Sequence, residues 1–214
     1  MKYRKLVENA KKPNGFWGKM MIKAMNKGHS SLTSWGLEHM NIGRTATVLD
    51  IGCGGGKTVD RLCSIVANGK VYGIDYSELS VKSSEKLNSK NILCNKAKIL
   101  QASVSDMPFD DNTFDNITAV ETYYFWPDKE NDVKEVFRVL KQGGTVMLLF
   151  EMLRTDDDPF KWEKVENMLN IKSVTPQEIR SVLESAGFEN INTYTKEGTT
   201  WLCATAQKPK DDEN

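Results

Sequence analysis

Three glycines at alternate positions follow a short apolar run in the first third of the chain. Residues 47–51 are predicted to form a strand with Asp50 near its end, and Gly52, Gly54 and Gly56 come directly after it. Such glycines let the backbone approach a ligand closely at the carboxyl end of a parallel strand, where open α/β sheets bind cofactors. Because a plain tight turn would use the same residues, this loop alone does not specify a ligand.

A carboxylate follows the next apolar run at a spacing that suits a nucleoside. Residues 70–75 end in Asp75, which lies 19 residues beyond Gly56. An acid at the end of the second strand of a βαβ unit can accept hydrogen bonds from both ribose hydroxyls. An aspartate that merely caps the following helix would explain this motif alone. The two motifs together predict a cofactor that contains a nucleoside.

The elements that would position these motifs alternate between short apolar runs and longer amphipathic ones. Strands are predicted at residues 47–51, 70–75, 97–102, 115–120 and 144–151, and helices at 56–66, 78–90 and 129–141. This alternation is typical of a parallel sheet covered by helices. Thr175 and Pro176 then predict the start of a helix that runs to residue 186. Residues 188–196 and 199–207 predict a final antiparallel hairpin.

With these motifs the chain resembles the class I S-adenosylmethionine-dependent methyltransferases, particularly the type 11 group that includes the ubiquinone and menaquinone methyltransferases. Residues 107–115 are similar to the family's segment before its fourth strand, and residues 138–144 to the turn before its fifth. The resemblance covers residues 45–207. It implies an α/β fold with a Rossmann-like, seven-stranded, mostly parallel sheet and a terminal antiparallel hairpin. An N-terminal helical lid at residues 1–44 and a disordered tail at 208–214 would flank this domain.

The resemblance implies S-adenosylmethionine as the cofactor and assigns its contacts residue by residue. Asp75 would hold the ribose, the glycine loop would admit the methionine portion, and Asp50 would hold its amino group or order the loop. The family usually has Asp or Asn followed by Ala near the adenine, where this chain has Ser103 and Val104, with Asp106 as an alternative contact. The expected cofactor-binding residues are Asp50, Gly52, Cys53, Gly54, Asp75, Tyr76, Ser103, Val104 and Val120.

The reaction that the resemblance implies is in-line methyl transfer to a small-molecule acceptor. The positive sulfonium already activates the donor, so alignment is the main task, and a base is needed only if the acceptor loses a proton. The end of the fourth strand supplies Glu121, Tyr123, Tyr124 and Trp126 at the sheet edge that carries the glycine loop. We expect Glu121, Tyr123 and His29 to be the catalytic residues. Packing under the next helix is the alternative for Trp126, and a capping or solvent-facing position is the alternative for His29.

The N-terminal segment is locally basic and carries two apolar stripes at helical spacing. Residues 2–27 contain eight Lys or Arg and one Glu. As a lid, the segment would turn Trp17, Met21 and Trp35 toward the site. Three interpretations remain open for its charge: a solvated face, a counter-charge for an acidic acceptor, or peripheral contact with anionic lipid.

The composition argues against nucleic acid as a partner and against a membrane-spanning segment, and it favours a cytoplasmic location. Lys plus Arg and Asp plus Glu both total 29 in 214 residues, so nucleic acid is not expected as a partner. No apolar run approaches the roughly 20 residues that span a bilayer. The four cysteines lack zinc spacing, so we expect reduced thiols, no structural metal and a cytoplasmic location.

Two other functions share parts of this pattern. A nicotinamide dehydrogenase would need a third glycine at position 57, where the chain has Lys57. A protein that binds the cofactor without turning it over would have the same motifs. Formation of S-adenosylhomocysteine in the presence of an acceptor pool would distinguish an enzyme from such a binding module.

Overall fold

The core of the protein is one seven-stranded sheet with strand order β3-β2-β1-β4-β5-β7-β6. The computed structural model describes Gly15, Gly18, Met20 and residues 29–210. The first five strands pair in parallel, whereas β7 runs antiparallel to both β5 and β6. The strands are β1 (Thr47–Ile51), β2 (Lys70–Asp75), β3 (Ala97–Gln101), β4 (Phe114–Val120), β5 (Leu140–Phe150), β6 (Glu189–Thr195) and β7 (Leu202–Gln207). The predicted α/β class, the mostly parallel sheet and the terminal hairpin are confirmed.

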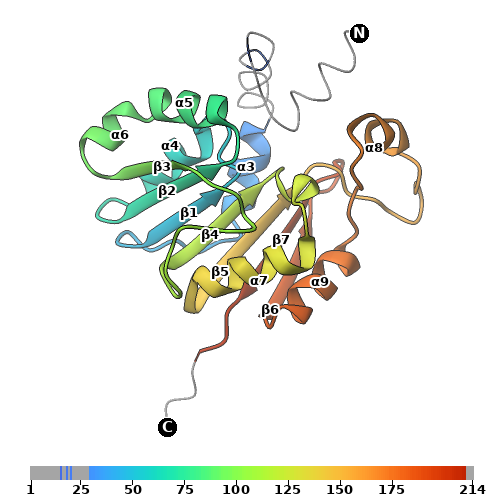
Figure 1. Cartoon of the computed structure of the whole chain (residues 1–214). Helices are drawn as coiled ribbons and strands as arrows, with labels where there is room; N and C mark the ends of the chain where they lie inside the picture. The colour runs from blue at the N-terminus through green and yellow to red at the C-terminus, as the bar shows by residue number, and fades with distance from the viewer. Residues whose placement is uncertain (1–14, 16–17, 19, 21–28, 211–214) are drawn as a thin grey trace.

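Helices cover both faces of this sheet, as Figure 1 shows. Val48 belongs to an apolar cluster with residues of α4, whereas its neighbour Leu49 belongs to a cluster on the opposite face with residues of α7 and α9. Leu32 of α3 packs with Leu149 of β5. The helices are α3 (Ser30–Leu37), α4 (Lys57–Ile65), α5 (Glu78–Leu87), α6 (Ser89–Leu93), α7 (Lys129–Val139), α8 (Glu163–Leu169) and α9 (Pro176–Ser185). No described helix is long and apolar enough to cross a membrane.

Side-chain caps fix where several helices begin. Thr175 accepts a hydrogen bond from the Glu178 amide at 3.1 Å, and the Glu178 carboxylate in turn accepts one from the Thr175 amide at 2.8 Å. This capping box satisfies amides that would otherwise lack a partner in the first turn of α9, as the Thr175-Pro176 signal predicts. The side chains of Ser77 and Asp128 cap α5 and α7, accepting hydrogen bonds from the amides of Ser80 and Asn131.

The junction between α7 and β5 differs from the sequence prediction. The helix ends at Val139 and the strand begins at once with Leu140, whereas the sequence predicts a helix to residue 141 and a strand from 144. Gly143 has the expected positive φ of 71°, but it lies inside β5, beside an irregularity in the pairing with β4. The positive φ of Gly143 therefore allows the strand to kink at this irregularity, and it does not end the helix.

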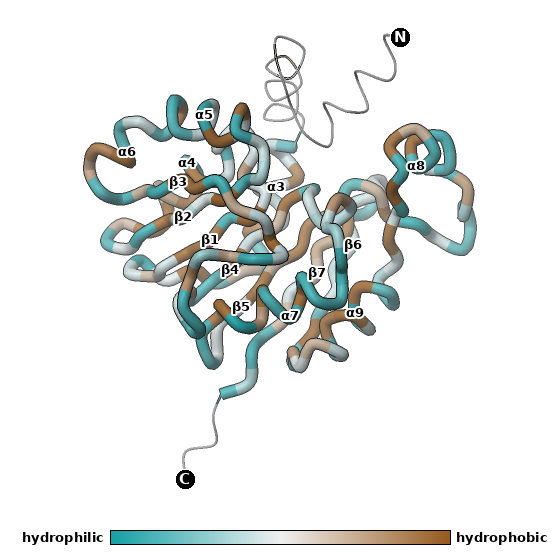
Figure 2. The backbone as a smooth tube through the Cα atoms, in the orientation of Figure 1, coloured by the Kyte–Doolittle hydropathy of each residue, from teal (hydrophilic) through white to brown (hydrophobic). Residues whose placement is uncertain are grey.

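The sequence does not predict the helices α6 and α8, because neither buries a full apolar stripe. Neither α6 nor α8 contains a buried residue, and a helix of that kind has no strong hydrophobic period. Figure 2 shows hydrophobic residues concentrated along the central strands and α9, while α8 lies apart from the sheet. Val165 and Leu169 of α8 pack against the core but stay only partly buried.

The N-terminal lid expected at residues 1–44 is described only in part. Trp17 and Met21 lie outside the described residues. Trp35 packs edge-on against His39 at a centroid distance of 5.0 Å and against Trp201 at 5.9 Å. It belongs to the cluster under α3, whereas Tyr123 belongs to the cluster on the opposite face of the sheet. The expectation that Trp35 faces the site together with Tyr123 is therefore wrong.

The sequence predicts that a disordered tail begins at Lys208, but the structure shows this residue buried and ordered by hydrogen bonds. Its side chain is buried, and the ammonium donates to the carbonyls of Phe137 and Leu140 at 2.9 Å each and to Asn112 Oδ1 at 2.8 Å. These carbonyls lie where α7 turns into β5, and a cation is favourable at a helix C-terminus. The ammonium therefore joins the last strand to this turn.

Replacing Lys208 with Met should lower the free energy of unfolding by about 1–3 kcal/mol, because buried acceptors lose their donor. Urea denaturation of the two proteins would measure the difference. Lys210→Met is the matched control, because Lys210 is exposed two residues further on. Equal effects of the two substitutions would contradict this account of Lys208.

Candidate functional site

The glycine loop combines a packed position with an open one. Gly52 has a φ of 67°, and a Cβ atom there would lie 2.2 Å from Thr122 Oγ1. Gly54 also has a positive φ, 52°, but a Cβ there would meet only the carbonyl of Gly52, at 4.0 Å. Packing therefore requires the first glycine, whereas the second leaves open space beside the backbone at the end of β1. This is where a ligand can approach the loop.

Asp75 connects the end of β2 to this loop. Its Oδ2 accepts a hydrogen bond from the Gly54 amide at 3.0 Å, and its Oδ1 accepts one from the Ser77 amide at 2.8 Å. The Ser80 hydroxyl also bonds to the carboxylate. Burial nevertheless raises the pKa of Asp75. A carboxylate has about four acceptor sites, so Asp75 keeps capacity for a ligand hydroxyl.

Asp50 is a second carboxyl group buried beside the loop. It is 2% exposed and accepts a hydrogen bond from Thr118 Oγ1 at 2.7 Å. Burial raises the pKa of Asp50 to about 7, against the lowering effect of Thr118, and the negative charge of Asp75 adds to the rise. Two buried carboxyl groups at one loop favour a cationic ligand, which would stabilise their ionised forms.

The remaining residues expected at the cofactor have mixed environments. Tyr76 follows Asp75 and is 40% exposed, whereas the side chain of Val104 is buried in the core. The backbone of Ser103 forms an isolated antiparallel bridge with Asp106, so the two proposed adenine contacts lie together. Cys53 is buried with its Sγ 3.8 Å from Ser84 Oγ, and burial raises the pKa of this thiol well above its usual range.

Val120 ends β4, and the chain turns sharply at the next residue, Glu121. Glu121 has a φ of 57°, a left-handed conformation that costs energy in a residue other than glycine. Its amide donates to the Leu149 carbonyl at 2.9 Å. Its Oε1 accepts from the backbone amide of Glu151, in a very short hydrogen bond, and from the Tyr124 hydroxyl at 3.4 Å. The turn therefore directs the carboxyl group back across the end of β5.

Glu121 lies in a small cluster of titratable groups. Burial raises its pKa to about 8; the hydrogen bonds from Glu151 and Tyr124 oppose this rise, and the Glu151 charge adds to it. His29 Nε2 lies 3.9 Å from Glu151 Oε2. Burial lowers the pKa of His29 despite the charge of Glu151. Around neutral pH the cluster therefore contains a protonated carboxyl group beside a neutral imidazole, an arrangement that can hold and pass a proton.

The same three groups have donor atoms of types that bind divalent metals. One atom from each of His29, Glu121 and Glu151 lies within 4.8 Å of the others. Ligand atoms in a tetrahedral shell with bonds of about 2.1 Å lie about 3.4 Å apart. The neutral imidazole of His29 could bind a metal, but Glu121, whose pKa is raised to about 8, would first have to lose its proton, so the cluster fits proton handling better than metal binding.

Tyr124, and not Tyr123, contacts Glu121. The Tyr124 hydroxyl also accepts a hydrogen bond from the Met152 amide at 3.0 Å. The Tyr123 ring instead packs against Trp126 at a centroid distance of 5.2 Å. Burial raises the pKa of Tyr123 to about 12, and its charged neighbours Glu178, Asp132 and Glu130 lie on or beside α7 and α9. The two tyrosines are adjacent in a short 3₁₀ turn, so a strand pattern could not assign their directions.

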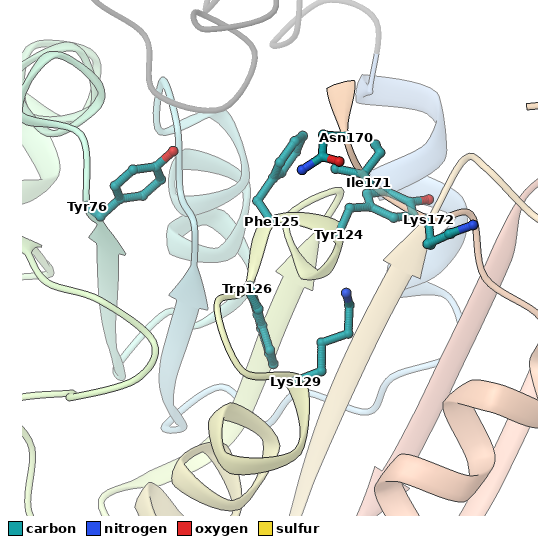
Figure 3. Close-up of a pocket in the computed structure, with 8 residues that line it drawn as sticks. All are labelled: Tyr76, Tyr124, Phe125, Trp126, Lys129, Asn170, Ile171 and Lys172. Carbon is teal, nitrogen blue, oxygen red and sulfur yellow. The ribbon is translucent and has the colours of Figure 1, made fainter. Parts of the chain in front are cut away.

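An open cavity of about 340 Å³ lies between the ends of β2 and β4 and the segment that follows α8. Figure 3 shows its lining residues, which come from these three places: Tyr76, Tyr124, Phe125, Trp126, Lys129, Asn170, Ile171 and Lys172. Sequence analysis does not predict the contribution of residues 170–172, which follow a helix that it does not predict either. Trp126 combines the two alternatives, because its side chain packs in the core cluster and also lines this cavity.

Comparison with known proteins agrees with this geometry. A family model described as "Methyltransferase domain" matches residues 49–148. The chain is 31% identical over 179 residues to the ubiquinone/menaquinone biosynthesis C-methyltransferase UbiE of Cronobacter sakazakii, a match that covers 72% of this chain and 71% of the relative. It is 27% identical over 183 residues to the uncharacterized methyltransferase YdaC of Bacillus subtilis strain 168, covering 85% of this chain and 93% of the relative.

The fold itself recurs in solved structures. A SAM-dependent methyltransferase from Aquifex aeolicus superposes with a TM-score of 0.68 at 23% identity, over 87% of this chain and 96% of that one. The strand order, the glycine loop with Asp75 and the sequence relatives all agree. The chain therefore belongs to the class I S-adenosylmethionine-dependent methyltransferases.

Proposed function

We propose that the protein binds S-adenosylmethionine at the carboxyl edge of its sheet and transfers the methyl group in line to a small-molecule acceptor. The observation that carries this proposal is the pair of buried carboxyl groups at the glycine loop, Asp50 and Asp75. S-adenosylmethionine carries an ammonium and a sulfonium, and a ligand with positive charge would offset the cost of burying both carboxylates. The cofactor supplies the activated methyl group.

The cofactor site would extend along the ends of β1, β2 and β4. Asp75 would hold the ribose and Asp50 the amino group. Gly52 and Gly54 would let the methionine portion lie close to the backbone. The open space beside Gly54 fits such a ligand. Further contacts would come from Cys53, Tyr76, Ser103, Val104 and Val120.

On the acceptor side we assign the proton-handling role to Glu121. Its carboxyl group lies at the end of β4, on the edge that also carries the glycine loop. Tyr124 holds Glu121 in position, and His29 lies beside Glu151 on the same side. This revises the catalytic set expected from the sequence by exchanging Tyr123 for Tyr124. We further propose that residues 1–44 act as a lid, since His29 already brings this segment to the site.

The reaction is expected to take place in the cytoplasm. All four cysteines are free, three of them buried, which agrees with a reducing compartment. The decisive experiment incubates the protein with methyl-labelled S-adenosylmethionine and a cell extract, followed by mass identification of the labelled product. Cofactor binding without labelled product would favour a binding module instead.

Asp75→Asn should weaken binding of S-adenosylhomocysteine about 10-fold to 100-fold, because a hydrogen bond to a charged acceptor contributes about 1.5–3 kcal/mol. Isothermal calorimetry would measure the affinity and thermal melting would verify folding. Asp157→Asn, at an exposed position, is the matched control and should bind normally. Wild-type affinity in a folded Asp75→Asn protein would place the ribose elsewhere.

Cofactor binding should release protons at pH 6. The Asp50 carboxyl group, with its pKa raised to about 7, is mostly protonated there in the free protein. An ammonium ligand favours the ionised form, so affinity should rise as pH increases from 6 to 8. Calorimetry in buffers of different ionisation enthalpy counts the protons. Asp50→Asn should release fewer protons than the wild type, and an equal count would exclude Asp50 as their source.

The rate should depend on the ionisation of Glu121. A carboxylate that acts as a base works in its ionised form, so kcat/KM should fall as pH decreases below about 8, the value to which burial raises this pKa. Glu121→Gln should lower kcat about 10²-fold to 10⁴-fold and remove this dependence. Tyr124→Phe should lower the rate and Tyr123→Phe should not. The opposite order for the two tyrosines would restore the original assignment to Tyr123.

A further inference from the structure

We propose that the methyl acceptor carries an anionic group, a carboxylate or a phosphate, and that Lys129 binds this group in the cavity shown in Figure 3. The inference rests on the proposed function, because it assumes that the acceptor occupies this cavity. It concerns a question that the methyltransferase fold leaves open, namely which class of molecule receives the methyl group.

The position of the cavity makes it the natural space for an acceptor. One wall contains Tyr76, which directly follows the proposed ribose-binding Asp75. Another contains Tyr124, whose hydroxyl bonds to Glu121. A molecule in this space would therefore lie between the cofactor and the group that handles its proton. The volume of about 340 Å³ is at the lower end of the range for small-molecule sites.

The charges around the cavity favour an anion. Its lining residues include two lysines and no carboxylate. Lys129 is half-buried, and within the described residues it forms no ion pair; its ammonium lies 5.6 Å from the centroid of the Tyr123 ring. Figure 3 shows this ammonium pointing into the space between Trp126 and Tyr124. A partly buried ammonium with no counter-ion is costly, so a ligand that supplies one gains affinity.

Of the carboxylates near Lys129, Asp128 and Glu178 are engaged by other groups, whereas Asp132 Oδ1 has no hydrogen-bond partner within the described residues. None of the three forms an ion pair with Lys129. Asp128 accepts hydrogen bonds from the amide and side chain of Asn131, and Asp132 is buried and accepts one from the Asp128 amide. Glu178 pairs with Arg154 and closes the capping box of α9. Lys129 is therefore available to a ligand.

The walls and the opposite end specify more of the acceptor. Tyr124, Phe125 and Trp126 present aromatic side chains, and Ile171 adds an apolar one. These suit a planar or apolar body between the two ends. Glu151 and Glu121 lie beyond Tyr124; the carboxylate of Glu151, and that of Glu121 once it has ionised to act as a base, would repel an anion. The acidic group of the acceptor should therefore lie at Lys129, with the reacting atom toward Glu121.

The test uses the full-length protein, methyl-labelled S-adenosylmethionine and the ultrafiltered small molecules of a cell extract. The labelled product should bind an anion-exchange resin at pH 7 and be released by salt. Treating the pool with phosphatase beforehand should abolish the product if the anion is a phosphate and leave it unchanged if it is a carboxylate. A neutral or cationic product would overturn the inference alone. Absence of any labelled product would count against the proposed function, and the inference would fall with it.

Lys129→Gln should raise the KM for this acceptor at least tenfold while kcat changes little, because the ammonium binds a part of the acceptor away from the reacting atom. Lys129→Arg should keep most of the affinity. Lys134→Gln is the matched control, with the same change of charge at an exposed position of α7. An unchanged KM in Lys129→Gln, or an equal rise in Lys134→Gln, would refute the role of Lys129.

Discussion

The carboxyl ends of four parallel strands meet at one edge of the sheet, and each places a carboxyl group there. The four residues are Asp50, Asp75, Glu121 and Glu151, from the ends of β1, β2, β4 and β5. Like charges gathered in a partly buried place must be protonated, hydrogen-bonded or paired with a cation. All three solutions occur or are expected here: raised pKa values, backbone amides aimed at the carboxylates, and a cofactor that carries positive charge.

This constraint divides the edge into two functional halves. On the β1–β2 side the amide of Gly54 bonds to Asp75, which the Ser77 amide also holds, so the shape of the loop is coupled to the position of the proposed ribose acid. On the β4–β5 side the amide of Glu151 and the hydroxyl of Tyr124 fix Glu121. In both halves a donor from one strand end holds the acid of its neighbour. The register of the sheet therefore sets the geometry of the chemistry.

The sequence predicts the sheet and the hairpin well, since these depend on local signals. Strands have apolar runs, and Thr175 with Glu178 forms a capping box within four residues. The acceptor half depends on contacts between distant residues. Glu121 meets Glu151 across thirty positions, and no local pattern records that pairing. Which of Tyr123 and Tyr124 contacts Glu121 depends on how a single 3₁₀ turn directs the two side chains. Hydrophobic periodicity does not specify these directions.

The weak burial of α8 affects how the acceptor specificity proposed for this fold can evolve. The segment around α8 contributes residues 170–172 to the cavity, yet α8 itself contains no buried residue. Substitutions or insertions on its exposed face remove little apolar contact, so they cost little stability. The glycine loop cannot vary in this way, because a side chain at Gly52 would collide with Thr122. Acceptor choice can therefore diverge between relatives while the methyl donor stays the same.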